Sequence, residues 1–320
     1  MDEFSLISTY FKPLARGFPG SLNLGDDAAI ISVPAGSELV VTKDAVSVGV
    51  HFIGNEDARL IAKKSLRVNL SDLAAMGATP LCYFLAMMLP KGTTEDWLKR
   101  FAEGLAEDQN EFHIHLAGGD TISTQGTLSF SVTAIGTVPA GKALRRSGAK
   151  MGDTIYVSGT LGDSALGLQL LRHPGVGRDP YLINRYYLPQ PRISLGQKLI
   201  SIAHACMDIS DGLVQDLGHI CKISGVGATI NRDKLPLSKS VRKCIEGDEE
   251  FWDCALSGGD DYELLFTAPP EKEPTIKALA EDLKLPLTAI GKITGDDGIT
   301  LLDETGKPLV ITGRGFKHFS

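Results

Sequence analysis

Apolar runs of strand length alternate with segments of helical periodicity in this chain, and this alternation constrains the fold most. In the first half, five runs fit β-strands: Ala28–Val33, Glu38–Thr42, Leu81–Leu89, His113–Ala117 and Leu128–Val138. Two segments, Glu56–Met76 and Thr94–Glu111, repeat apolar residues at roughly 3.6-residue spacing and are expected to be helices. A polar, glycine-containing stretch, Pro139–Asp153, then interrupts the pattern.

The pattern restarts in the second half. Helices are expected near Asp163–Leu171, Tyr181–Tyr187, Ser194–Ala205 and Asp211–Ser224, and strands at Thr154–Ser158, Tyr262–Ala268, Leu287–Ile293 and Ile299–Leu302. Since both halves mix the two element types, each is expected to be an α/β (α+β) domain. The 320 residues suffice for two such domains, predicted at residues 1–138 and 154–320 with a linker at 139–153.

Net charge argues against a nucleic-acid partner, and the length of the apolar runs argues against a membrane-spanning helix. The formal net charge is −7, whereas proteins that bind nucleic acids usually carry a basic surface. The longest apolar run, Leu81–Leu89, has nine residues, far fewer than the ~20 of a membrane-spanning helix. The five cysteines are odd in number and lack CxxC spacing, which is typical of reduced thiols in the cytoplasm.

Aspartates recur within two residues of glycine, serine or threonine at six places. These are Gly25-Asp26-Asp27, Thr42-Lys43-Asp44, Asn69-Leu70-Ser71-Asp72, Gly118-Gly119-Asp120-Thr121, Asp208-Ile209-Ser210-Asp211-Gly212 and Gly258-Gly259-Asp260-Asp261. Asp44, Asp120 and Asp208 are expected directly after apolar strands, where α/β proteins gather ligand groups. Asp-Gly pairs can also simply form turns. The repetition favours a shared site.

Carboxylates that converge need cations. Two unit charges about 4 Å apart repel by roughly 4 kcal/mol at an effective dielectric constant near 20. A ligand set of oxygens alone selects a hard cation such as Mg²⁺, which retains substrate phosphates in its coordination shell. The aspartates therefore predict phosphoryl transfer chemistry.

Two other patterns are expected to be without function. Gly136–Lys142 matches the start of a P-loop, but Ala143 stands where the loop needs a serine or threonine hydroxyl for Mg²⁺. His113 and His115 could present two imidazoles on one strand face. With no third ligand nearby in the sequence, a packed strand is the favoured interpretation there.

The aspartate motifs occur in a specific order together with others. The set is Leu24–Ala29, Asn69–Ala78, Gly118–Thr121, Arg146–Lys150, Met207–Leu213 and Leu256–Leu264, followed by the closing Gly315–Phe319. In this order, and over essentially the whole chain, they resemble the thiamine-monophosphate kinase family. The resemblance implies transfer of the γ-phosphoryl group of ATP to thiamine monophosphate. It also implies a fold shared with aminoimidazole ribonucleotide synthetase and selenophosphate synthetase, in which the N-terminal sheets of a homodimer pair into a barrel.

The resemblance further implies roles for individual residues. Several Mg²⁺ ions would be held by Asp27, Thr42, Asp44, Asp72, Asp120, Asp208 and Asp211. ATP would contact Gly119, Asp120, Arg146 and Ser210, and thiamine monophosphate would contact His51, Asp260 and Phe316. The residues expected to act in catalysis are Asp44, Asp72, Asp120 and Asp211. Phe316 and His51 could instead have packing roles.

Two residues depart from the family pattern. Lys43 stands between two expected metal ligands, and Asp260 is one methylene shorter than the glutamate often found at its position. In a regular strand Lys43 would point away from Thr42 and Asp44, but its ammonium could also bend back and replace one cation.

Three alternatives remain open. Selenophosphate synthetase would require a reactive cysteine in an N-terminal glycine-rich loop, yet the first cysteine is Cys82. Aminoimidazole ribonucleotide synthetase is disfavoured by motif details alone. A catalytically silent protein that binds Mg·ATP as a signal is disfavoured by the intact aspartates.

Overall fold

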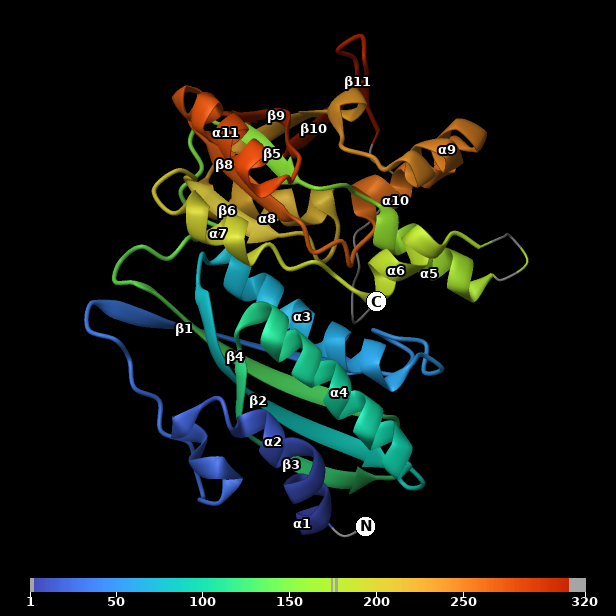
Figure 1. Cartoon of the computed structure of the whole chain (residues 1–320). Coiled ribbons are helices and arrows are strands. Elements are labelled where there is room, and N and C mark those ends of the chain that lie inside the picture. The colour runs from blue at the N-terminus through green and yellow to red at the C-terminus, as the bar shows by residue number, and fades with distance from the viewer. Residues whose placement is uncertain (1–2, 174, 176–177, 311–320) are drawn as a thin grey trace. The chain divides into compact units, whose positions relative to one another are not determined.

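The computed structural model describes residues 3–173, 175 and 178–310, and in it the chain divides into two units (Figure 1). One unit comprises Met1–Leu73 with Ala78–Gly141, and the other comprises Ala74–Gly77 with Lys142–Ser320. Each unit contains one sheet and several helices, so the predicted mixed α/β class is confirmed.

The first unit is built on a four-stranded sheet of order β1-β4-β2-β3. Its strands are β1 (Ser37–Ser47), β2 (Thr79–Pro90), β3 (His115–Thr124) and β4 (Ser129–Pro139). Strands β2 and β3 pair in parallel, and the other pairs are antiparallel. The sheet is open, and β1 and β3 lie at its two edges.

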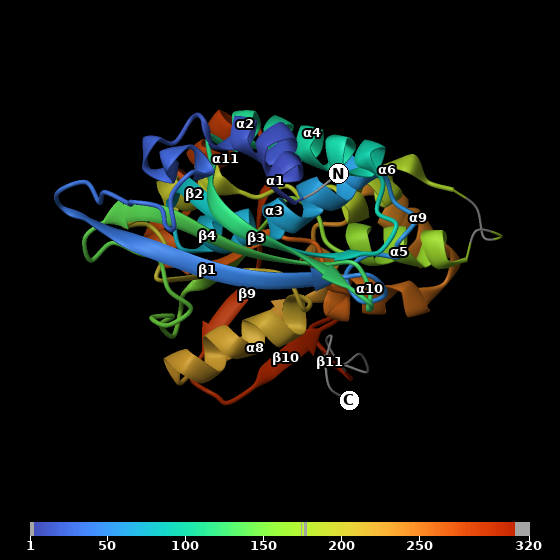
Figure 2. The ribbon, with the colours of Figure 1, turned by 90° about the horizontal axis from the view of Figure 1, so that it is seen from below.

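Helices α3 (Ala58–Ala75) and α4 (Glu95–Phe112) lie along one face of this sheet (Figures 1 and 2). Helix α4 begins after Thr94, whose hydroxyl accepts a hydrogen bond from the backbone N–H of Trp97 at 3.2 Å. Shorter helical segments precede the sheet in the chain: α1 (Glu3–Leu6), η1 (Ile7–Phe11), α2 (Lys12–Ala15) and η2 (Pro19–Leu24). The opposite sheet face carries exposed Leu39, Val41 and Ile122.

One predicted strand of this unit is wrong. Ala28–Val33 is irregular, and Ile30 and Val33 are exposed rather than packed in a sheet. The apolar run has no neighbouring strand to pair with, and pairing rather than composition decides whether a strand forms. The segment Gly136–Lys142, which resembles the start of a P-loop, does not form a loop at its beginning, because Gly136–Pro139 belongs to strand β4.

The second unit has a seven-stranded sheet of order β11-β10-β7-β9-β5-β8-β6. The strands are β5 (Thr154–Ser158), β6 (Ala205–Asp208), β7 (Gly227–Asn231), β8 (Leu264–Ala268), β9 (Leu287–Thr294), β10 (Ile299–Leu302) and β11 (Pro308–Leu309). The helices are α5 (Asp163–Arg172), α6 (Pro180–Tyr187), α7 (Ile193–Leu199), α8 (Leu213–Ser224), α9 (Lys239–Gly247), α10 (Trp252–Ser257) and α11 (Glu273–Leu283), with short 3₁₀ turns η4 (Arg232–Lys234), η5 (Glu249–Phe251) and η6 (Pro270–Lys272).

Alternate residues of the sheet face two separate helix layers in this unit. Ile155 and Val157 of β5 pack into a core with α8, whereas Tyr156 packs with α7 and α11. This alternation is the period-two pattern of a strand buried on both faces.

Several predicted bounds in the second unit are corrected. The helix predicted at Ser194–Ala205 ends at Leu199, and Ala205 starts β6. The helix predicted from Asp211 begins at Leu213, because Gly212 has a φ of 117° that no helix accommodates.

Candidate functional site

The Gly118-Gly119-Asp120 motif lies within edge strand β3. A Cβ added at Gly119 would lie 2.1 Å from the carbonyl oxygen of Leu85 on β2, so the two strands approach this closely only with glycine there. The motif was predicted to follow a strand end. Instead β3 continues to Thr124, and Asp120 projects from inside the strand.

Asp27 and Asp120 line a pocket of about 420 Å³ in the first unit, called the first pocket below. Its other polar lining residues are Asp26, Lys43, Thr121, Ser131 and Thr133. The Lys43 ammonium donates a hydrogen bond to the Thr133 hydroxyl at 3.3 Å across the β1–β4 pair. Asp120 accepts a hydrogen bond from the backbone N–H of Thr121 at 2.8 Å. The first pocket thus joins a lysine, three carboxylates and hydroxyls.

A second group, the Asp44–Asp72 cluster, consists of Thr42, Asp44, Asn69 and Asp72. The Thr42 hydroxyl donates to the carboxylate of Asp72, and Asn69 accepts from the backbone N–H of Asp44 at 3.2 Å. Burial raises the pKa of Asp44 to about 6, and the charge of Asp72 adds to the rise. Helix α3 therefore places Asp72 beside Thr42 and Asp44 of β1.

The first pocket and the Asp44–Asp72 cluster lie on opposite sheet faces. Along β1, Thr42 and Asp44 point to one face and Lys43 to the other, so the ammonium has not bent back towards Asp44. Asp44 and Asp120 also lie on opposite edge strands, three strand spacings or roughly 14 Å apart. Within one chain, the first unit does not bring these two carboxylates together.

His51 closes the turn that follows β1. Its Nδ1 accepts a hydrogen bond from the backbone N–H of Ser47 at 3.2 Å, and its own backbone N–H donates to the Ser47 carbonyl at 3.0 Å. With Nδ1 as acceptor, a neutral ring carries its proton on Nε2. The imidazole thus has a structural role here, alongside the predicted contact to substrate.

In the second unit, Asp208 ends strand β6 and is buried, and the loop Asp208–Gly212 follows it. One carboxylate oxygen of Asp216 accepts the backbone N–H groups of Ser210, Asp211 and Gly212, each at 3.1 Å. Burial raises the pKa of Asp216 to about 7. The sequence analysis missed Asp216, although an acid in the first turn of a helix is a common partner of such N–H groups.

The described residues bring three possible metal ligands together at Asp211, Asp216 and His219, whose ligand atoms lie within 4.8 Å of one another. Of these, Asp211 was predicted to hold a metal. Its carboxylate also accepts a hydrogen bond from Gln215 at 2.7 Å. Asp216 already binds three backbone donors, so its own contribution is to shape the loop.

The loop that carries Asp260, residues Ser257–Glu263, is hydrogen-bonded to the Asp208–Gly212 loop. The backbone N–H of Asp260 donates a hydrogen bond to the backbone carbonyl of Ser210 at 2.9 Å. The backbone N–H of Tyr262 donates to the backbone carbonyl of Ile209 at 2.8 Å. Asp260 has a φ of 67°, an uncommon conformation for a residue other than glycine. The structure therefore brings the predicted substrate residue Asp260 next to the predicted ATP residue Ser210.

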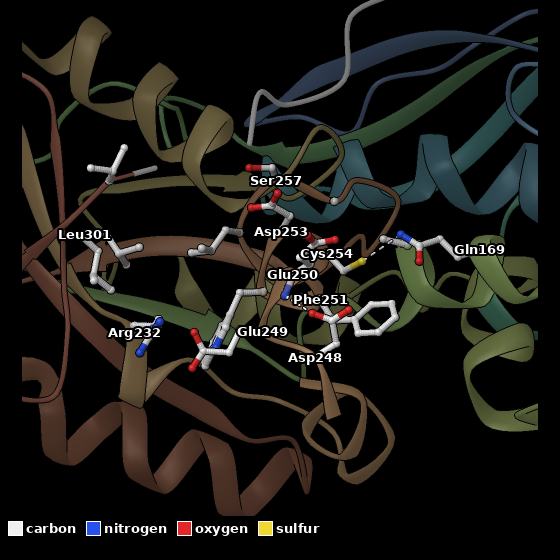
Figure 3. A pocket seen from close by; sticks show the side chains of 16 residues that line it. Gln169, Arg232, Asp248, Glu249, Glu250, Phe251, Asp253, Cys254, Ser257 and Leu301 are labelled. Atoms are coloured by element: carbon white, nitrogen blue, oxygen red, sulfur yellow. Dashed lines mark hydrogen bonds between the residues drawn. The ribbon is translucent and has the colours of Figure 1, made fainter. Parts of the chain in front are cut away.

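A second pocket, of about 920 Å³, opens beside this loop and is lined in part by Ser257 and Gly258. Figure 3 shows the side chains around it, among them the acids Asp248, Glu249, Glu250 and Asp253. The Arg232 guanidinium lies over the Trp252 ring, 5.1 Å from its centroid. The acidic lining suits a cation better than a phosphate group, so this pocket is not a candidate for the triphosphate of ATP.

Two predicted site residues have no described contact to the others. Arg146 is exposed on the segment before β5, and Phe316 lies outside the described residues.

Comparison with known proteins places the whole chain in one family. Residues 25–138 match the N-terminal domain of AIR synthase related proteins, and residues 150–304 match their C-terminal domain. The chain is 42% identical over 325 residues to the thiamine-monophosphate kinase of Escherichia coli strain K12, covering 99% of this chain and 98% of that one. The chain belongs to the thiamine-monophosphate kinase family. It is therefore an enzyme, a phosphotransferase, and the alternative of a catalytically silent nucleotide-binding protein is set aside.

Solved structures of the thiamine-monophosphate kinase family share this fold. The enzyme from Stenotrophomonas maltophilia K279a superimposes with a TM-score of 0.81 at 45% identity, over 87% of this chain and 89% of that chain. AaThiL complexed with AMPPCP and TMP superimposes with a TM-score of 0.79 at 32% identity, over 99% of this chain and 97% of that chain.

Proposed function

We propose that this enzyme transfers the γ-phosphoryl group of ATP to thiamine monophosphate and so forms thiamine diphosphate. The likeness to AaThiL complexed with AMPPCP and TMP carries the proposal, because it extends over 99% of this chain and that structure pairs an ATP analogue with TMP. The relatives named thiamine-monophosphate kinase, at 42–43% identity, support the same reaction.

The Asp44–Asp72 cluster fits a divalent cation. The two carboxylates and the Thr42 hydroxyl offer only oxygen atoms as metal ligands, and hard cations such as Mg²⁺ prefer oxygen ligands. The raised pKa of Asp44 reflects burial and repulsion by Asp72, and a bound cation would relieve both. When bound, Mg²⁺ would supply positive charge to offset the charge of the phosphate groups.

Other predicted metal ligands fit less uniformly. Asp27 and Asp120 offer carboxylates in the first pocket, but Lys43 shares that pocket, and an ammonium group repels a cation. In the second unit, Asp211 offers a carboxylate beside the loop that Asp216 holds. We propose all three acids as ligands.

The chain's own residues would position the substrates. The acceptor is a phosphomonoester that is ionised at neutral pH, so the mechanism needs no general base to create the nucleophile. Gly119, Arg146 and Ser210 would bind ATP. His51, Asp260 and Phe316 would bind thiamine monophosphate, with Asp260 near the cationic thiazolium. This arrangement would hold donor and acceptor for in-line transfer.

We also propose that the active enzyme is a homodimer whose first-unit sheets join into a barrel. Exposed Leu39, Val41 and Ile122 on the open sheet face support an interface there. A dimer that sets β1 of one subunit beside β3 of its partner would also bring together the two edge strands that carry Asp44 and Asp120, which lie apart within one chain.

A cytoplasmic location is proposed as well. Its support is that all five cysteines are free thiols, four of them buried. In the part of the chain that the structure describes, none of the helices combines the length and the apolar character needed to span a bilayer.

Product analysis tests the proposed function. Purified protein with Mg²⁺, ATP and thiamine monophosphate should yield thiamine diphosphate and ADP in equal amounts. Free thiamine should not be phosphorylated, because it lacks the phosphate group that the site would bind. Turnover of free thiamine, or none of the monophosphate, would contradict the proposal.

A further inference from the structure

Five charged side chains are gathered next to Asp260, and none of them is among the residues predicted to bind a metal, ATP or substrate. This group, called the ionic cluster, consists of Asp163, Arg185, Arg192, Asp261 and Glu263. The three carboxylates are at most 1% exposed. The two arginines come from α6 and from the residue preceding α7.

Glu263 is the centre of the ionic cluster. Its carboxylate accepts Nη2 of Arg185 at 2.9 Å and Nε of Arg192 at 2.6 Å, and Arg192 adds a second, short bond through Nη2. The Ser158 hydroxyl donates to the same carboxylate at 2.6 Å. Both oxygens of Glu263 are therefore held by at least two donors, which fixes the side chain in one orientation.

Asp261 anchors the same loop at a second point. Its carboxylate accepts the backbone N–H groups of Gly162 at 2.7 Å and Ser164 at 3.3 Å. Its backbone carbonyl accepts Nη2 of Arg185 at 3.3 Å. Residues on both sides of Tyr262 are thus held from behind by α5 and Arg185.

Stability alone does not account for this arrangement. Burying ionised groups is costly, and replacing a buried ion pair by apolar residues of similar volume often leaves stability unchanged or improved. What the ionic cluster adds is orientation. The loop that it holds adopts the uncommon φ values of Asp260 and Tyr262, which are 67° and 52°.

The orientation reaches the neighbouring loop through the backbone. The carbonyl of Glu263 accepts the N–H of Ile209 at 2.9 Å, in addition to the two bonds from Asp260 and Tyr262 described above. A shift of Glu263 would therefore displace both loops, and with them Asp260 and Ser210.

We propose that Arg185 and Arg192 are positioning residues, which act through Glu263 to hold the Asp260 loop in register with the Asp208–Gly212 loop. The proposal rests on the proposed function only for the role of Asp260 in substrate binding. Neither arginine needs to touch substrate.

Hydrogen exchange tests the positioning without any assay of activity. Arg192→Gln is the informative variant because Arg192 is less buried than Arg185 and its loss is less damaging to folding. Exchange in peptides covering Ser257–Glu263 should rise at least ~10-fold, because the amides of Asp260 and Tyr262 lose their fixed acceptors. Peptides covering Thr154–Ser158 should keep their protection.

A matched control lies on the next helix. Lys198 lies on α7 and forms an exposed ion pair with Asp282. Lys198→Gln removes this ion pair and should leave exchange in both peptides unchanged. Arg192→Lys keeps the charge but not the two-pronged geometry, and should fall between the parent and Arg192→Gln. Unchanged exchange in Ser257–Glu263 for Arg192→Gln, or an equal rise throughout the unit, would overturn the proposal.

A double-mutant cycle connects the positioning to catalysis. Arg192→Gln should lower kcat/KM for thiamine monophosphate by roughly 10-fold or more, the scale of a misplaced binding group. In an Asp260→Asn background, Arg192→Gln should lower kcat/KM much less, because both substitutions act on the same contact between Asp260 and the substrate. Fully additive losses would refute action through Asp260. A parent enzyme that does not phosphorylate thiamine monophosphate would refute the proposed function instead, and the exchange result would still stand.

Discussion

Asp44 and Asp72 are the two carboxylates of the Asp44–Asp72 cluster. One comes from a strand and the other from a helix, and the Thr42 hydroxyl donates a hydrogen bond to Asp72. Their identity and spacing in the sequence indicated a metal site. Their proximity depends on how α3 packs on β1, which the sequence could suggest only through the family resemblance.

Asp44→Asn and Asp72→Asn should each lower kcat at least ~10²-fold, the scale of losing one strong transition-state interaction. Folding should persist, because each change removes a negative charge from a pair that repels when no metal is bound. Steady-state kinetics at saturating Mg²⁺ and urea unfolding measure the two effects. Near-normal turnover of both variants would show that the Asp44–Asp72 cluster is not the catalytic centre.

For Lys43 the structure decides between the two orientations that the sequence allowed. The structure places its ammonium in the first pocket with Asp26, Asp27 and Asp120, not beside Asp44. Lys43→Thr should therefore raise the affinity or number of bound Mg²⁺ ions by removing a positive charge from an acidic pocket, as measured by equilibrium dialysis. Lys43→Arg, which keeps the charge, serves as the control. Indistinguishable binding by the parent and Lys43→Thr would assign the lysine no electrostatic role.

At the level of elements, most strands that pair with neighbours were predicted, but β7, which pairs with both β9 and β10, was missed. Leu81–Leu89 and Leu128–Val138 correspond to β2 and β4, and Ile299–Leu302 is β10. Ala28–Val33 has similar composition but no partner, so it forms no strand. Helices α9, α10 and α11 were not predicted.

Gly119→Ala tests how closely β2 and β3 must approach. The added Cβ would lie 2.1 Å from the Leu85 carbonyl, so the strands must separate, at a cost of about 1–3 kcal/mol in unfolding free energy. Activity should fall further, since Asp120 is the next residue. Gly126→Ala is the matched control, because its Cβ would lie 3.4 Å from the nearest atom. Equal stability of the two variants would contradict the close approach.

At the scale of the whole molecule, the two units hold different parts of the predicted site. The first holds Asp27, Thr42, Asp44, Asp72 and Asp120, and the second holds Asp208, Ser210, Asp211 and Asp260. The resemblance predicted these residues as one set. Spacing along the chain could not reveal that Asp44 and Asp120 lie on opposite edges of one sheet, since strand order is a tertiary property.

Subunit complementation tests whether a homodimer closes this gap. Asp44→Asn and Asp120→Asn should each be nearly inactive alone. If each site takes Asp44 from one subunit and Asp120 from its partner, co-expression should restore up to about a quarter of parental activity, because half of the dimers are mixed and each mixed dimer has one intact site. Co-expressed protein that stays as inactive as the single variants would show that the two residues do not meet across a dimer.

The fate of the γ-phosphoryl group tests the central claim most directly. The enzyme is supplied with Mg²⁺, thiamine monophosphate and ATP labelled at the γ-phosphorus, and the products are separated by chromatography. Direct transfer to the phosphate of the acceptor predicts that the label appears in the terminal phosphate of thiamine diphosphate, in a one-to-one ratio with ADP. Label released as inorganic phosphate while thiamine monophosphate remains unchanged would contradict the account.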